Sequence, residues 1–313
     1  MQIQRIIYAA LIGNGLIAVS KLAIGIISGS VALLAEAAHS VADTFNQVFL
    51  LISLRLSKRP ADLEHPFGHG KERFFWAFIT AIILFVVGAF FSIFEGAKKI
   101  VAGELVEPGH FVSIYVALGL AFVFELASLG VAFSEVKHLI KEEKKPLFQI
   151  LKTSKDPTTK TVLAEDTAAL LGVVIAAIGT YLMQTTKNSL FDGAASILIG
   201  IILLVVAFVL AQQSRRLLLG EAASTEDRQK IRETILSHSQ VRDVIDLLTM
   251  HLGPDEILVN SHLSFKDGLE TGQIEKIVDE IEMNIRRVVP EATHIFIEAE
   301  TGQISGKNQE QGK

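Results

Sequence analysis

Apolar residues occur in long blocks along the chain up to about residue 220, and short polar segments separate the blocks. A helix that crosses a bilayer needs about 20 mostly apolar residues. Six blocks have that length, at approximately 6–28, 31–54, 74–99, 111–135, 161–183 and 190–213. The pattern therefore predicts an α-helical membrane protein with six transmembrane helices in residues 1–220.

From about residue 221 the apolar runs become short and alternate with charged residues. In chain order they predict a helix at "TEDRQKIRETILSHS", strands at "VRDVIDLLTMHL" and "DEILVNSHLSF", an amphipathic helix at "TGQIEKIVDEIEMNIRRVV" and a strand at "THIFIEAE". This order is typical of a small cytoplasmic α+β domain of ferredoxin-like type, expected at 221–300. Residues 301–313 are polar without periodicity, which predicts a flexible tail.

Composition and charge agree with a membrane protein. Half of the 313 residues are hydrophobic and the mean hydropathy is +0.43, which is too apolar for an ordinary soluble domain. The absence of cysteine excludes disulfides and thiolate metal ligands. Lysine and arginine gather in the second and fourth loops and after the sixth helix, and basic loops face the cytoplasm. We expect cytoplasmic termini, and either a bacterial inner (cell) membrane or an organelle membrane.

The first apolar block is expected to stay in the protein as a helix. Gly13, Asn14, Gly15 and Lys21 interrupt the block, and no clear cleavage site follows it. A secretory signal peptide has an uninterrupted apolar region before such a site.

Three ionisable residues lie in the middle of the second block. Glu36, His39 and Asp43 are spaced so that they share one helix face. An ionisable side chain at mid-membrane costs about 2.5–3.5 kcal/mol on insertion scales, so the three are expected to face a partner, water or an ion. Glu165 and Asp166 begin the fifth block and would converge with them if the two helices pack.

A purely structural polar cluster is one interpretation of these residues. A divalent-metal site is the other, because neighbouring carboxylates need a cation or protons to neutralise them. Imidazole and carboxylate ligands suit Zn²⁺, and an oxygen-rich set also suits Mn²⁺ or Fe²⁺. Since the same groups bind protons, the residues predict an exchange of metal for protons.

Other polar residues carry weaker signals. The loop "ADLEHPFGHGKER" holds Asp62, Glu64, His65 and His69, which predict either a second metal site or a structural turn. Structural ion pairs are expected for Glu95, Glu125 and Glu135, and Asp192 is expected to interact with the dipole of the helix that it begins. The tail histidines His238, His251 and His294 are expected at the surface.

These motifs resemble the cation diffusion facilitator family, whose members exchange metal for protons. The resemblance rests on the His-x-x-x-Asp pair of the second helix, the loop "HPFGHGKER" and the α+β tail, and covers roughly residues 5–300. The stretch "DPTTKTVLAEDTAALLG" is similar to the branch that includes the mitochondrial zinc transporter nine. The resemblance implies a homodimer that associates through its tail domains.

The resemblance also implies ligands. His39 and Asp43 match the family's first ligand pair, and Asp166 matches the aspartate of its second. The histidine of that second pair falls on Val162, which cannot bind metal, so Glu165 is the candidate replacement. A regulatory loop site would use Asp62, His65 and His69, and His262 is a weak match to a tail site whose other positions are acids here.

The expected function is a secondary transporter that exports a divalent metal, most often zinc, from the cytoplasm in exchange for protons. Its partners are the metal, protons and the bilayer, with no resident cofactor and no nucleic acid. A membrane metal sensor, or a manganese, iron or cobalt transporter, is the alternative. An intramembrane metalloenzyme is disfavoured because the chain lacks His-Glu-x-x-His and Gly-x-Ser-x-Gly motifs.

Overall fold

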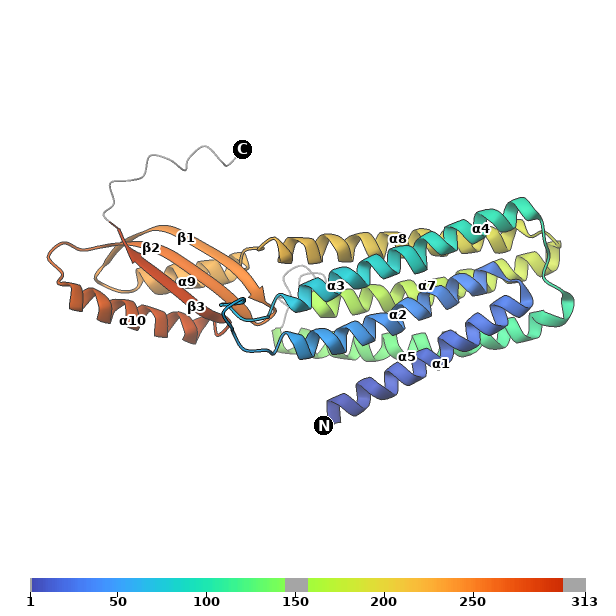
Figure 1. The fold of residues 1–313 in the computed structure, drawn as a ribbon, viewed down its shortest axis with the longest axis horizontal. Coiled ribbons are helices and arrows are strands. Elements are labelled where there is room, and N and C mark those ends of the chain that lie inside the picture. The colour runs from blue at the N-terminus through green and yellow to red at the C-terminus, as the bar shows by residue number, and fades with distance from the viewer. Residues whose placement is uncertain (1, 144–156, 301–313) are drawn as a thin grey trace. The chain divides into compact units, whose positions relative to one another are not determined.

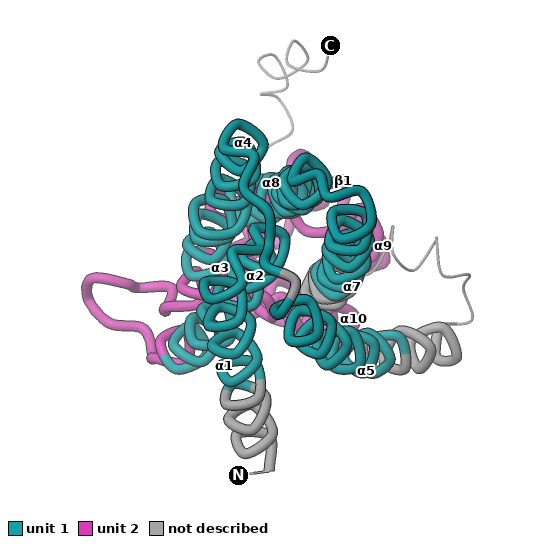
Figure 2. Tube along the Cα trace, turned by 90° about the vertical axis from the view of Figure 1, so that its right-hand side faces the viewer, with its two compact units in different colours: residues 1–55, 75–215 teal, residues 56–74, 216–313 magenta. Residues whose placement is uncertain are grey.

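A computed structural model describes residues 2–143 and 157–300 of the chain. It divides into two compact units (Figure 2). The first, the helical unit, comprises residues 1–55 and 75–215. The second, the tail unit, comprises residues 56–74 and 216–313, so the loop after the second helix groups with the C-terminal domain. The domain boundaries at residues 220 and 300 stay predictions.

The helical unit is built from long helices (Figure 1). Their bounds are α1 Gln2–Ser28, α2 Val31–Leu56, α3 Glu72–Ile83, α4 Phe91–Ala102, α5 Phe111–Glu143, α7 Pro157–Thr186 and α8 Leu190–Leu218. A π-helical stretch, η1 (Leu84–Phe90), connects α3 to α4, and a short 3₁₀ turn, η2 (Pro108–His110), precedes α5. All six predicted apolar blocks therefore contain helix.

Four segments among the described residues are long and apolar enough to cross a membrane, at 72–102, 111–131, 165–186 and 190–218. The apolar helix that the structure describes within α1, Asn14–Ser28, is shorter than a span. Although α2 has 26 residues, its interior carries Glu36, His39 and Asp43, which lower its hydropathy. A helical membrane domain is thus confirmed, whereas the number of six spans stays a prediction.

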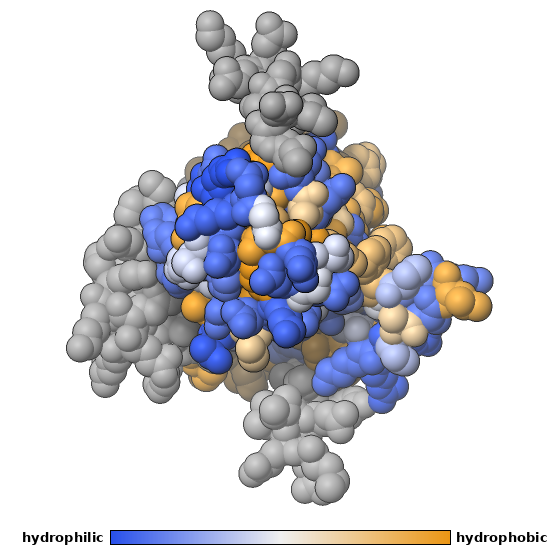
Figure 3. Space-filling view, turned by 90° about the vertical axis from the view of Figure 1, so that its left-hand side faces the viewer, coloured by the Kyte–Doolittle hydropathy of each residue, from blue (hydrophilic) through white to orange (hydrophobic). Residues whose placement is uncertain are grey.

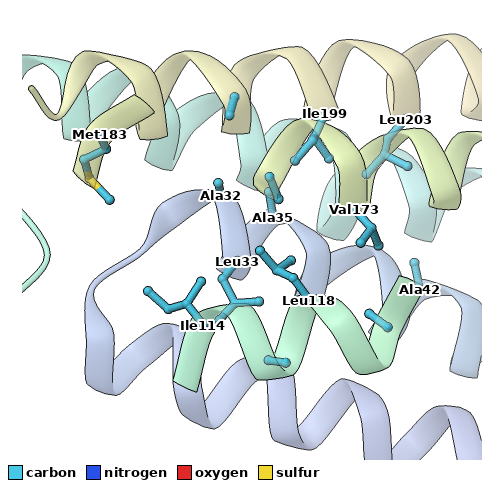
Figure 4. Close-up of a cluster of buried hydrophobic side chains, with 14 of the residues drawn as sticks. Ala32, Leu33, Ala35, Ala42, Ile114, Leu118, Val173, Met183, Ile199 and Leu203 are labelled. Atoms are coloured by element: carbon cyan, nitrogen blue, oxygen red, sulfur yellow. The ribbon is translucent and has the colours of Figure 1, made fainter. Parts of the chain in front are cut away.

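Small and aliphatic residues fill the core of the helical unit (Figure 4). The cluster includes Ala32, Leu33, Ala35 and Ala42 of α2, Ile114 and Leu118 of α5, Val173 and Met183 of α7, and Ile199 and Leu203 of α8. Small residues also let backbones approach closely, as membrane helices require. A Cβ added at Gly96 of α4 would lie 2.6 Å from the carbonyl oxygen of Gly193 in α8.

The start of α2 is fixed by an acid from another helix. Asp192 of α8 accepts hydrogen bonds from Ser30 Oγ at 2.9 Å and from the Val31 N–H at 2.8 Å. Lys99 of α4 donates to the carbonyl oxygen of Gly29 at 2.9 Å, in the turn before α2. The expectation that Asp192 serves the dipole of its own helix was therefore incomplete, because its carboxylate caps α2.

The tail unit has the predicted order of elements. It contains α9 (Thr225–Leu236), β1 (Val241–Gly253), β2 (Glu256–Phe265), α10 (Thr271–Val288) and β3 (Ala292–Ala299). The sheet order is β1-β2-β3, with β1 and β2 antiparallel and β2 and β3 parallel. Helix α10 makes the crossover that a parallel pair needs. The described residues hold one strand fewer than the β-α-β-β-α-β order of a full ferredoxin-like unit.

Both tail helices bury an isoleucine face in the core of the tail unit. The α9 face consists of Ile231 and Ile235, and the α10 face of Ile277, Ile281 and Ile285. Ser224 caps the N-terminus of α9, where its hydroxyl accepts a hydrogen bond from the Asp227 N–H at 3.0 Å. The face of this unit shown in Figure 3 is mostly hydrophilic, as a domain in water requires.

Candidate functional site

The polar stripe predicted in α2 faces the interior of the helical unit. Glu36 and His39 are 0% and 1% exposed, and the Asp43 side chain is 27% exposed. His39 Nε2 lies 3.5 Å from Asp43 Oδ2, which is an ion-pair distance without hydrogen-bond geometry. Neither ring nitrogen of His39 has a hydrogen-bond partner among the described residues. A buried imidazole with both nitrogens unpartnered is a ready ligand or proton acceptor.

The two acids of α7 contact different neighbouring helices. Glu165 accepts a hydrogen bond from Asn46 Nδ2 of α2 at 3.3 Å. Asp166 accepts one from Ser128 Oγ of α5 at 3.0 Å. Successive helical residues differ in direction by about 100°, so adjacent acids serve two different partners. Each carboxylate is therefore hydrogen-bonded to a helix next to the polar stripe. The side chain of Val162 lies outside the described residues.

Electrostatic contacts connect the two helices. The Asp43 charge acts on Glu165, and the Asp166 charge acts on His39. Glu125 of α5 also lies within Coulomb range of His39 and Asp43. A structural ion pair was expected for Glu125 from the sequence, whereas its proximity to His39 and Asp43 was not. Its position in the interior of an apolar block was the available signal.

These buried groups do not form a tight cluster. Among the described residues, only Asp62, His65 and His69 bring three candidate ligand atoms within 4.8 Å of one another. The four residues predicted for the transport site, His39, Asp43, Glu165 and Asp166, come instead from α2 and α7, and the two α7 acids bond to different neighbouring helices.

The loop group belongs to the tail unit and is organised by the backbone. Asp62 Oδ1 accepts hydrogen bonds from the His65 N–H at 2.6 Å and the Glu64 N–H at 3.0 Å. Its Oδ1 lies 3.3 Å from His65 Nδ1, and its Oδ2 lies 3.5 Å from His69 Nε2. The His65 N–H bond, more than any other contact, holds the pKa of the Asp62 carboxyl below its ordinary value. Asp62 is therefore ionised at neutral pH and available as a ligand.

The loop packs on the tail domain within the same unit. A Cβ added at Gly70 would lie 2.6 Å from the Leu252 carbonyl oxygen at the end of β1. The Phe67 ring meets the His294 ring edge-on, with centroids 5.4 Å apart. Gly68 has a φ of +82°, which glycine adopts without strain, and this turn lies between His65 and His69.

The remaining tail histidines contact nearby polar groups. His262 lies 3.6 Å from Glu298 and 3.4 Å from Glu300, the acids expected on the last strand. His238 lies 3.0 Å from Glu280 of α10. His251 and His294 are half-buried rather than fully exposed.

Two family models together match nearly the whole chain. The cation efflux transmembrane domain matches residues 7–219, and the cation efflux protein cytoplasmic domain matches residues 223–301. The boundary between them falls where the apolar blocks end.

Curated relatives agree with the family models. Metal tolerance protein C4 of Arabidopsis thaliana is 32% identical over 262 residues, or 84% of this chain and 57% of the relative. The mitochondrial proton-coupled zinc antiporter SLC30A9 of Mus musculus is 30% identical over 285 residues, or 89% of this chain and 50% of the relative. The manganese efflux system protein MneP of Bacillus subtilis (strain 168) is 25% identical over 299 residues, or 94% of each chain.

The chain spans about half the length of the first two of these relatives. The resemblance drawn from the second-helix motif, the loop and the tail is confirmed by both family models. Membrane helices, a buried polar stripe and a matching cytoplasmic domain thus lead to one conclusion: the chain belongs to the cation efflux family of metal transporters.

Proposed function

We propose that this protein is a secondary transporter that exports a divalent transition metal, with zinc as its main cargo, from the cytoplasm in exchange for protons. The observation that carries the proposal is His39, which is buried in a membrane helix with both ring nitrogens unpartnered and with carboxylates of α5 and α7, Glu125 and Asp166, nearby. A structural histidine in such a place would be expected to hold a hydrogen bond.

The proposed ligands are His39 and Asp43 of α2 with Glu165 and Asp166 of α7. Glu165 replaces the ligand that the family carries at the position of Val162 here. When the metal leaves, protons neutralise the same carboxylates and imidazole, which couples the two fluxes. Alternating access around a site between helices is the general mechanism of secondary carriers.

The proposed ligand set has one imidazole and three carboxylates. Zinc accepts such a set, but so does manganese, which prefers oxygen. One relative's name specifies zinc and another's specifies manganese efflux. We favour zinc because relatives named as zinc antiporters are the more similar in sequence, and manganese, iron or cobalt is the second candidate.

Further proposals concern the assembly and the loop. Six transmembrane helices with cytoplasmic termini fit the basic loops, and a homodimer through the tail domains fits the match to the cytoplasmic family domain. Asp62, His65 and His69 form a second, regulatory cation site, supported by their mutual distances within 4.8 Å. His262 with its two glutamates is a weaker tail candidate.

The test is metal flux in proteoliposomes with Zn²⁺, Mn²⁺, Fe²⁺ and Co²⁺ supplied separately. Glu165→Gln and Asp166→Asn should each reduce the flux of the preferred metal by about 10-fold or more. Glu95→Gln is the matched control, because Glu95 is a membrane-helix acid that pairs with Lys98 at 3.5 Å. Equilibrium metal binding without flux would contradict the transporter and favour a membrane sensor.

A further inference from the structure

A lysine is buried beside the proposed metal ligands. Lys21 of α1 is 1% exposed, and its ammonium donates hydrogen bonds to Glu36 Oε2 at 3.2 Å and to Ser40 Oγ at 2.9 Å. Glu36 is itself fully buried. Burying two charges in a membrane helix bundle is costly even when they are paired. This ion pair therefore requires a functional explanation as well as a structural one.

The ion pair lies on the ligand-bearing face of α2. Glu36 and Ser40 are one helical turn apart, and His39 and Asp43 follow at three and seven residues from Glu36. The Lys21 charge acts electrostatically on His39, Asp43 and Glu125. The ammonium of Lys21, paired with Glu36, is thus part of the region that the proposed cargo, itself a cation, must enter.

Glu36 also connects α2 to the second ligand-bearing helix. A Cβ added at Gly172 of α7 would collide with Glu36 Oε1, so the α7 backbone passes directly against this carboxylate. Glu36 Oε1 has no hydrogen-bond partner among the described residues, although it is buried. One oxygen of Glu36 is thus held by Lys21, and the other lies against the α7 backbone without a hydrogen-bond partner among the described residues.

We propose that Lys21 is a positioning and specificity residue of the metal site: its ammonium holds Glu36 as a counter-ion, keeps this carboxylate out of the ligand set and lowers the negative charge that an incoming metal meets. The inference rests on the transport function proposed above. It concerns residues outside the proposed ligand set, which is His39, Asp43, Glu165 and Asp166.

Removing the Lys21 charge and removing the Glu36 charge should then change the affinity for metal in opposite directions. Removing the ammonium frees Glu36 as an additional oxygen ligand and makes the site more negative, so metal binds more tightly and leaves more slowly. Removing the Glu36 charge leaves the ammonium unpaired, and it repels the metal. Removing both restores the original net charge. An extra carboxylate also favours Mn²⁺ over Zn²⁺.

The experiment measures the KM and maximal rate of Zn²⁺ and Mn²⁺ flux in proteoliposomes. Lys21→Met should lower the KM for Zn²⁺ about 10-fold, reduce the maximal rate and raise the preference for Mn²⁺. Glu36→Gln should raise the KM about 10-fold, and the double variant should return to within about threefold of the original. Lys98→Met is the matched control, since the exposed Lys98 pairs with Glu95 on α4, and it should leave KM unchanged.

A purely structural ion pair would behave differently. Both single variants would then lose rate and thermal stability without opposite shifts in KM, and that result would overturn the inference. If a single variant does not fold, Lys21→Arg and the double variant provide the test. Both should keep a KM near that of the original protein. A folded double variant whose KM is changed 10-fold or more would also overturn the inference. Failure of the original protein to transport any metal would instead contradict the proposed function itself.

Discussion

Two groups of candidate ligands differ in how they are held. The loop group, Asp62, His65 and His69, is local in sequence, organised by backbone N–H groups and compact. The buried group of α2 and α7 comes from helices far apart in the chain, leaves both His39 nitrogens unpartnered and is spread out. A preformed site suits a cation that stays bound, whereas ligands on separate helices can assemble and separate during transport. We therefore propose different functions for the two groups.

The same chemical change in the two groups should separate these functions most strongly. Asp43→Asn removes a charged ligand from the buried group, and we expect a loss of metal flux of about 100-fold or more. Asp62→Asn is the matched change in the loop, and we expect flux within about threefold of the original, with one fewer zinc bound at equilibrium. Similar flux losses in both variants would contradict separate functions for the buried group and the loop group.

The close contact between α2 and α7 gives a second way to test the buried group. Gly172→Ala would place a methyl group against Glu36 Oε1 and displace the Glu36 carboxylate from its position beside Lys21. We expect destabilisation by about 1–3 kcal/mol, together with reduced flux. Thermal unfolding in detergent measures the first effect. Gly119→Ala on α5 is the control, because nothing lies within 4 Å of its added Cβ; equal effects at the two positions would contradict the packing argument.

The cap on α2 gives a third, smaller effect on the buried group. Asp192→Ala leaves the Val31 N–H and the Ser30 hydroxyl without their acceptor, which should cost about 1–2 kcal/mol of stability. Asp192→Asn keeps an acceptor oxygen and should cost less. An unchanged unfolding temperature in Asp192→Ala would show that this cap does not determine the start of α2.

The sequence predicts contacts that are local in the chain better than contacts between distant helices. The α2 stripe and the loop group were both found, because helical periodicity and short spacing are local properties. The tail elements were found for the same reason. The contacts of Asp192 with α2 and of Lys21 with Glu36 could not be derived, since periodicity gives the face of a helix but not its neighbour. The proximity of Glu125 to His39 and Asp43 could not be derived either, because these residues lie on another helix.

The smallest expected effect concerns the pH dependence of the loop. Because the pKa of Asp62 is lowered in the folded loop, its hydrogen bonds contribute above its ordinary pKa of about 4 and are lost as the pH falls below that value. Exchange protection of the His65 amide should therefore be constant from pH 7 to about pH 5 and weaker in Asp62→Asn. Equal protection in the two proteins would contradict an Asp62-organised loop.

The central claim is that the buried group carries metal in exchange for protons. The most direct measurement follows Zn²⁺ and internal pH together in proteoliposomes under an imposed pH gradient, for the original protein and Asp43→Asn. We predict Zn²⁺ movement against the proton flux, reversal of Zn²⁺ flux when the gradient is reversed, and loss of both fluxes in Asp43→Asn. Zn²⁺ flux that does not depend on the pH gradient, or that persists unchanged in Asp43→Asn, would contradict the claim.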